Sequence, residues 1–150
     1  MSHFAFDDRN IRWKSFDGLE HLWFSVLDID DENKIIHVLY KFAGNRQIVL
    51  HRHKTLNKTM VIQGEHRLYH ANGELKEVRP VGSYTVSPPS DDPHREGGGD
   101  QDVVVSFTIY GDEETLYEVL DDDLNVVASL TAKDFASFYE RSPRLETLVL

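Results

Sequence analysis

The sequence is most informative at Gln47-Ile48-Val49-Leu50-His51-Arg52-His53. Its β-branched and apolar residues are typical of a β-strand, in which successive side chains point to opposite faces. His51 and His53 therefore point to the same side, about 7 Å apart along the chain, while Arg52 points away. Two converging imidazoles predict a metal site, since neutral imidazole suits zinc, iron, copper and nickel alike. The alternative is an exposed strand with two solvated histidines.

Short runs of aromatic and β-branched residues, separated by turn residues, continue on both sides of this stretch. Between residues 36 and 42 they alternate with a period of two, which predicts a half-buried strand. The spacing of the runs is typical of an all-β sandwich or barrel. The predicted strands are 21–27, 34–42, 47–53, 58–63, 66–70, 74–78, 83–87, 102–110, 115–120 and 125–130.

Two local signals stand at the ends of predicted strands. Asn72-Gly73 lies between two of them and predicts a hairpin with a type I′ turn. After the last strand, Thr131 can cap a helix from Ala132 to Arg141, with Asp134 at the capping-box position and Pro143 ending it. This helix would place an aromatic stripe, Phe135, Phe138 and Tyr139, against the barrel.

The segment from Pro88 to Asp100 has no regular pattern. Its prolines, carboxylates and three consecutive glycines predict a loop, and loops on rigid scaffolds often carry function. His94 and Glu96 lie within it. His66 and His70 flank the predicted hairpin and are expected to face solvent.

The composition limits the partners and the chemistry. A formal net charge of -10 opposes binding to nucleic acid phosphates and to anionic lipid surfaces. There is no cysteine, so disulfides and thiolate metal sites are excluded and any metal must be held by nitrogen and oxygen. The N-terminal residues lack the pattern of a signal peptide, and no apolar run approaches a membrane span. These features predict a cytoplasmic protein without nucleic acid or membrane partners.

The spacing around the two histidines resembles the first motif of the cupin superfamily, the RmlC-like proteins. Gly44, His51, His53 and Gly64 match that motif, although the first spacer is one residue too long. Asn57 stands where the motif has a metal-binding glutamate. The second cupin motif is recognisable in Gly82, Pro88 and His94, with Ser90 in place of a glycine and His94 one position late.

This resemblance implies an all-β, single-domain cupin over residues 1–150. Its fold would be a jelly-roll barrel, the double-stranded β-helix, with a barrel core at about 16–130 and a short C-terminal helix at about 132–141. Within the superfamily, the chain is similar to the acetylacetone-cleaving dioxygenase and to the cupin domains of anti-sigma factors. Cupins commonly pair, so the resemblance also implies a homodimer.

The dioxygenase of this group uses three histidines and no carboxylate. Its ligands correspond by motif to His51, His53 and His94. Three neutral ligands would leave a divalent ion with its full charge, which favours an anionic or enolisable substrate and leaves coordination positions open. Asn57 is a candidate weak ligand or hydrogen-bond donor, and Gln63, at even spacing from it, a candidate donor in the cavity. Glu96 follows His94 closely enough to orient its ring or act as a base.

Two functions are therefore expected from the sequence. The first is a mononuclear metal-dependent dioxygenase that cleaves a carbon-carbon bond in a small diketone-like compound, with Fe(II) favoured over zinc, nickel or manganese. The second is a non-catalytic regulatory cupin that binds a metal or small molecule and reports it to a partner. The departures at both motifs add weight to the second function, because a binding protein tolerates a degraded site more readily than an enzyme does. The dioxygenase is the leading expectation and the regulatory cupin the alternative.

Overall fold

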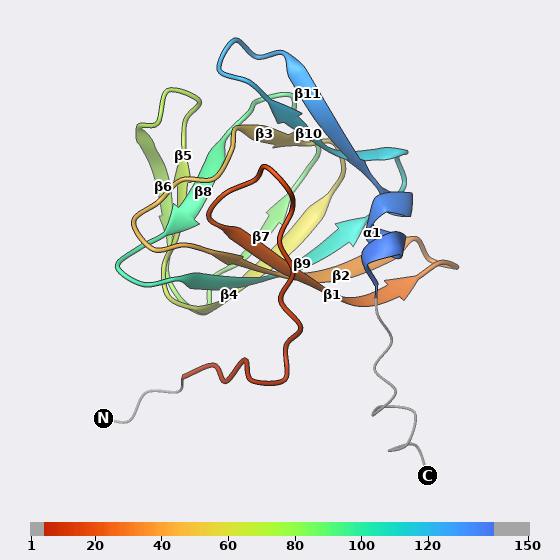
Figure 1. The fold of residues 1–150 in the computed structure, drawn as a ribbon, viewed down its shortest axis with the longest axis horizontal. Helices are drawn as coiled ribbons and strands as arrows, with labels where there is room; N and C mark the ends of the chain where they lie inside the picture. Colours follow the sequence, from red (N-terminus) through yellow and green to blue (C-terminus); the bar gives the residue numbers. More distant parts are fainter. Residues whose placement is uncertain (1–4, 140–150) are drawn as a thin grey trace.

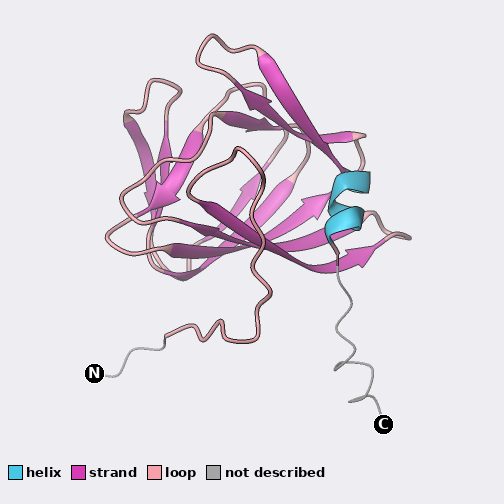
Figure 2. Cartoon of the chain, in the orientation of Figure 1, coloured by secondary structure: helices cyan, strands magenta, loops and turns pink. Residues whose placement is uncertain are grey.

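The computed structural model describes residues 5–139, which fold into eleven strands and one helix (Figures 1 and 2). The strands are Leu22–Asp30 (β1), Ile35–Phe42 (β2), His51–His53 (β3), Asn57–Gln63 (β4), His66–Tyr69 (β5), Leu75–Arg79 (β6), Tyr84–Ser87 (β7), Arg95–Gly98 (β8), Val103–Tyr110 (β9), Thr115–Leu120 (β10) and Val126–Thr131 (β11). The helix is Ala132–Phe138 (α1). Within the described range, no helix has the length and hydrophobicity of a membrane span.

The strands form two walls of a barrel, which Figure 1 shows from one side. One wall is the five-stranded sheet β1-β2-β9-β4-β7. The other consists of the three-stranded sheets β11-β10-β3 and β6-β5-β8. These two are linked where His51 and His94 exchange backbone hydrogen bonds of 3.1 and 2.9 Å. The predicted all-β jelly-roll with a short C-terminal helix is confirmed.

The hydrophobic core fills the space between the walls. It is built from alternate residues of the long strands, as the period of two predicted. Val38, Phe107 and Ile109 are among its fully enclosed members. Aromatic rings join the helix to β1 and to the segment before it: Phe16 stacks on Phe24 with the centroids 4.1 Å apart, and the Phe138 ring meets both edge-on.

The helix starts as the sequence predicted. The Thr131 side chain accepts a hydrogen bond from the Asp134 backbone, and the Asp134 carboxylate accepts one from the Thr131 N–H, which is a complete capping box. Phe135 is buried, and Phe138 and Tyr139 pack against the core. The structure ends the helix at Phe138, whereas Arg141 and Pro143 lie outside the described residues.

All ten predicted strands are present, although the one predicted at 47–53 is a strand only at His51–His53. The segment 88–100 is not wholly a loop. Residues Arg95–Gly98 form β8, which pairs with β5. Glycine is uncommon in strands, so the sequence pattern did not indicate β8. Here glycine is needed for close packing, because a Cβ at Gly97 would lie 1.8 Å from the Arg46 carbonyl oxygen.

The hairpin between β5 and β6 is present, but its turn differs from the predicted type. A type I′ turn needs positive φ at both central residues, whereas φ is positive at Gly73 (90°) and not at Asn72. The Gly73 N–H donates to the His70 carbonyl at 2.9 Å, and the Asn72 side chain accepts from the Glu74 N–H. This geometry is that of a three-residue loop with glycine in the left-handed region.

We predict that Gly97→Ala destabilises the protein strongly. The added methyl group would overlap backbone atoms, which must shift, and the free energy of unfolding should fall by about 3 kcal/mol. Gly82→Ala is the control, because Gly82 has positive φ but open space around it, and its cost should be about 1 kcal/mol. Urea unfolding measures both. Equal losses in the two variants would contradict the close-packing explanation.

Candidate metal centre

Three of the predicted site residues converge because the chain just before β8 forms an isolated bridge with β3. His51 and His53 point inward from β3, where both side chains are buried, and His94 lies beside His51 just before β8. The ring centroids of His51 and His94 are 4.7 Å apart, and those of His53 and His94 are 4.8 Å apart. The structure thus brings together the three histidines that the resemblance implied.

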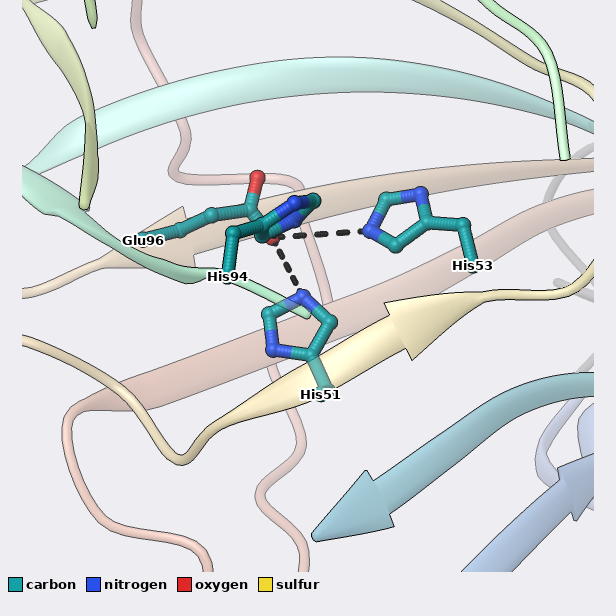
Figure 3. Close-up of side chains that lie close together, drawn as sticks. All are labelled: His51, His53, His94 and Glu96. Atoms are coloured by element: carbon teal, nitrogen blue, oxygen red, sulfur yellow. Dashed lines mark hydrogen bonds and ion pairs between the residues drawn. The ribbon is translucent and has the colours of Figure 1, made fainter. Parts of the chain in front are cut away.

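Glu96 adds a carboxylate to this group, as Figure 3 shows. Its Oε2 lies 2.7 Å from His51 Nε2, 3.4 Å from His94 Nε2 and 3.8 Å from His53 Nε2. Glu96 is two residues after His94, so both point to the same face of the extended chain. The expected all-histidine site therefore becomes a three-histidine, one-glutamate cluster. Its carboxylate comes from β8, and not from the motif position that Asn57 occupies.

The donor atoms of this cluster fit a divalent metal ion. One ligand atom from each of the four residues lies within 4.8 Å of the others. Both ring nitrogens of His53 and Nε2 of His94 are buried, and nothing in residues 5–139 forms a hydrogen bond with them. Buried polar atoms normally have partners, so the convergence of these nitrogens fits a bound cation. Nitrogen and oxygen donors of this kind suit several transition metals.

The protonation states favour metal binding. Burial lowers the pKa of His53 to about 4, and burial also lowers the pKa of His94, so both rings are neutral near pH 7. Burial alone would raise the pKa of Glu96, but interactions with the four surrounding histidines hold that pKa well below its usual range. The carboxylate is therefore ionised. A carboxylate with such a low pKa is a weak proton acceptor, so it suits a ligand better than a base.

His51 already has the orientation of a ligand. Its Nδ1 lies 2.8 Å from the Val49 carbonyl oxygen, which accepts a hydrogen bond from Nδ1–H. This contact fixes the ring and directs Nε2 toward Glu96 and the other histidines. Metal-binding histidines are commonly held in this way by a backbone carbonyl.

The fourth histidine around Glu96 is His66, which was expected from the sequence to face solvent. That expectation is wrong, because His66 is fully buried on β5 and its Nε2 lies 2.8 Å from Glu96 Oε1. Its ring stacks on Phe42 with the centroids 5.6 Å apart. The strand alternation contained the signal, since His66 and Leu68 share a face and Leu68 is buried. His66 holds the carboxylate oxygen that faces away from the other three histidines.

Asn57 and Gln63 lie where the sequence did not expect them. Asn57 is buried, but its Oδ1 accepts from the Tyr117 hydroxyl at 2.8 Å and its Nδ2 donates to the Thr55 carbonyl at 3.0 Å. Both ends of the amide are thus engaged away from the cluster. Asn57 instead positions Tyr117, whose ring centroid is 4.9 Å from that of His53.

Gln63 was expected to face the cavity because of its even spacing from Asn57. A β-bulge between Val61 and Gln63 interrupts the register with β9, so even spacing no longer means the same face. Gln63 is half-buried at the end of β4 and lines neither of the cavities that meet the cluster.

Two cavities meet the cluster, and His53 and Glu96 line both. The smaller, about 40 Å³, has mainly apolar walls that include Phe16, Leu22 and Ile48. The larger, about 340 Å³, is lined by the β5–β6 hairpin, by β7 and by His53, His94 and Glu96. The smaller volume holds little more than a water molecule, whereas the larger is in the range of small-molecule pockets. The larger cavity therefore has room for a small molecule beside the cluster.

Comparison with solved structures identifies the fold. An RmlC-like cupin protein from Ralstonia eutropha superposes with a TM-score of 0.69 at 19% identity, over 93% of this chain and 85% of that one. An acetylacetone dioxygenase from Acinetobacter johnsonii superposes with a TM-score of 0.66 at 11% identity, over 92% of this chain and 93% of that one. A cupin-like protein from Thermotoga maritima superposes with a TM-score of 0.58 at 16% identity, over 88% of this chain and 96% of that one.

The likeness is one of structure. No protein-family model matches the sequence, and no curated protein sequence is significantly similar to it. The implied similarity to the cupin domains of anti-sigma factors is not tested by these structures and stays a prediction. The barrel topology, the position of the histidines and the superposed structures agree, and the chain has the cupin fold.

Proposed function

We propose that this protein is a metal-dependent dioxygenase that cleaves a carbon-carbon bond in a small enolisable carbonyl compound. The observation that carries the proposal is the convergence on an ionised carboxylate of buried ring nitrogens that have no hydrogen-bond partner within residues 5–139. An acetylacetone dioxygenase with the same fold supports the choice of substrate class. Fe(II) is the favoured metal, with zinc, nickel or manganese as alternatives. The homodimer implied by the resemblance stays a prediction.

The chain's own residues have distinct roles in this proposal. His51, His53, His94 and Glu96 would hold the ion. A bound divalent ion would supply positive charge to stabilise an enolate, and Fe(II) would also supply electrons for reaction with oxygen. Tyr117 and Phe107 enclose His53 and limit access of water from the core side. The larger cavity receives the substrate.

Glu96 changes the charge that the sequence analysis assumed. One carboxylate cancels part of the charge of a divalent ion, so the ion binds more tightly while attracting anions less strongly than at an all-histidine site. A singly charged chelate, such as a diketone enolate, would then neutralise the remainder. The proposed substrate class therefore still fits the four-residue cluster.

The first prediction concerns metal content. Protein purified without added metal should contain about one divalent ion per chain, and His53→Ala and His94→Ala should each lose most of it, because each removes one of four ligands. His70→Ala is the matched control, since His70 is an exposed histidine on the nearby hairpin. Elemental analysis gives the answer. Unchanged metal in the two ligand variants would refute the site.

The second prediction concerns His66, which contacts the cluster without belonging to it. His66→Ala should weaken metal binding about 10- to 100-fold, because Glu96 loses the donor that fixes its orientation. His66→Gln can place an amide N–H near the same carboxylate oxygen and should recover much of the affinity. Competition with a chelator measures both, alongside urea unfolding. If Gln and Ala behave alike at equal stability, His66 does not orient the carboxylate.

The third prediction separates catalysis from simple binding. Iron-loaded protein should consume oxygen with a panel of β-diketones and hydroxy-ketones, in a fixed ratio to the diketone lost. Glu96→Gln and His94→Ala should abolish uptake, while the His70→Ala control retains it. An oxygen electrode records the reaction. Absence of uptake across the panel in fully iron-loaded protein would remove the dioxygenase proposal and leave a binding cupin.

A further inference from the structure

The larger cavity, which residues of the metal cluster line, also carries cationic side chains. Lys76 and Arg79 of β6 line it, together with the hydroxyl-bearing residues Thr59, Thr85 and Ser87. His94 and Glu96 line the same space. A molecule held at the cluster would therefore extend toward β6. The side chains of β6 therefore determine which chemical group such a molecule can carry at the end away from the cluster.

Arg79 is directed toward the interior by the strand register. It lies opposite His66 in the β5–β6 pair, and directly opposed side chains share one face of a sheet. His66 in turn contacts Glu96 at 2.8 Å. The Arg79 side chain is only 12% exposed. A largely buried guanidinium group thus lines the cavity, and its residue pairs across the strands with one that contacts the cluster.

The hydrogen bonds of Arg79 are incomplete. Its Nη2 donates to Glu77 Oε2 at 3.1 Å, whereas the buried Nε–H has no partner within residues 5–139. A buried donor without an acceptor is costly, and a ligand oxygen would relieve that cost. The planar guanidinium matches the two oxygens of a carboxylate better than any other side chain does.

The charges around the cavity favour an anion once a metal is bound. Glu77 pairs with Arg79, Asp92 Oδ2 lies 3.5 Å from Lys76 Nζ, and Glu96 is surrounded by imidazoles. The positive charge of the two cationic side chains and a divalent ion would together exceed the negative charge of these three carboxylates. A cavity with a positive excess in a protein of net charge -10 is a local feature that attracts anions from solution.

Resting on the proposed metal-dependent function, we propose that the substrate carries a carboxylate in addition to its enolisable carbonyl groups, and that Arg79 binds this carboxylate. The chelating oxygens lie at the cluster, and the carboxylate accepts hydrogen bonds from the Arg79 guanidinium, including its partnerless Nε–H. Lys76 adds positive charge at the same wall. The substrate class is then an acidic diketone and not a neutral one.

Zinc-loaded protein tests this without turnover. Succinylacetone, a diketone with a carboxylate, and its uncharged methyl ester are titrated into it by calorimetry. The acid should bind about tenfold more tightly than the ester, which corresponds to about 1.4 kcal/mol. Arg79→Met should remove this preference and leave the affinity for the ester unchanged. Arg67→Met should keep the preference, because Arg67 of β5 is paired with Glu65, just before that strand, and does not line the cavity.

The outcomes separate this inference from the proposed function. Failure to bind zinc refutes the metal centre itself. Equal affinity for acid and ester, or a preference that survives Arg79→Met, overturns the role of Arg79 while the metal centre stands. If the zinc-loaded protein binds neither diketone, glutarate is titrated instead. Glutarate binding that Arg79→Met abolishes supports the carboxylate site, and absence of glutarate binding overturns it.

Discussion

The Glu96 carboxylate is a charge buried inside the barrel, and the imidazoles around it make that burial possible. An isolated carboxylate in such a place would take up a proton, because desolvation disfavours its charged form. Here His51 and His66 contact its two oxygens at 2.7 and 2.8 Å, so each oxygen has a separate partner. The rest of the site follows from this arrangement. The carboxylate is ionised, it cannot rotate freely, and one of its oxygens faces His53 and His94.

Much of this structure could be predicted from the sequence, and the exceptions have physical causes. The period of two revealed the long strands, and Thr131 with Asp134 marked the start of the helix. β8 was missed because its glycines are selected for backbone contact, which leaves no side-chain pattern to detect. The role of Glu96 as a member of the cluster could not be predicted without β8. In a strand, a residue two positions after His94 points to the same face as His94, whereas in a loop it has no fixed direction. The expectation that Gln63 faces the cavity failed for a different reason. A bulge changes the face on which a residue lies without altering its spacing in the sequence.

The two cavities divide the cluster into an apolar side and a polar side. Aromatic and aliphatic side chains on the core side reduce hydration, and electrostatic interactions at the cluster are correspondingly stronger there. The β5–β6 hairpin and β7 provide hydroxyl groups and cations on the other side. A ligand would thus exchange water for fixed polar groups at one end and for imidazoles at the other. This division, and not the size of the cavity alone, is what restricts the ligands that fit.

The backbone hydrogen bonds between His51 and His94 join residues that are far apart in sequence. These two residues become neighbours only when the chain has closed a long loop containing β4 to β7, a type of contact that forms slowly because of its entropic cost. The donor atoms therefore have no fixed arrangement in the unfolded chain. An ion in solution would meet a competent site late in folding, so it would stabilise the finished barrel without guiding its assembly.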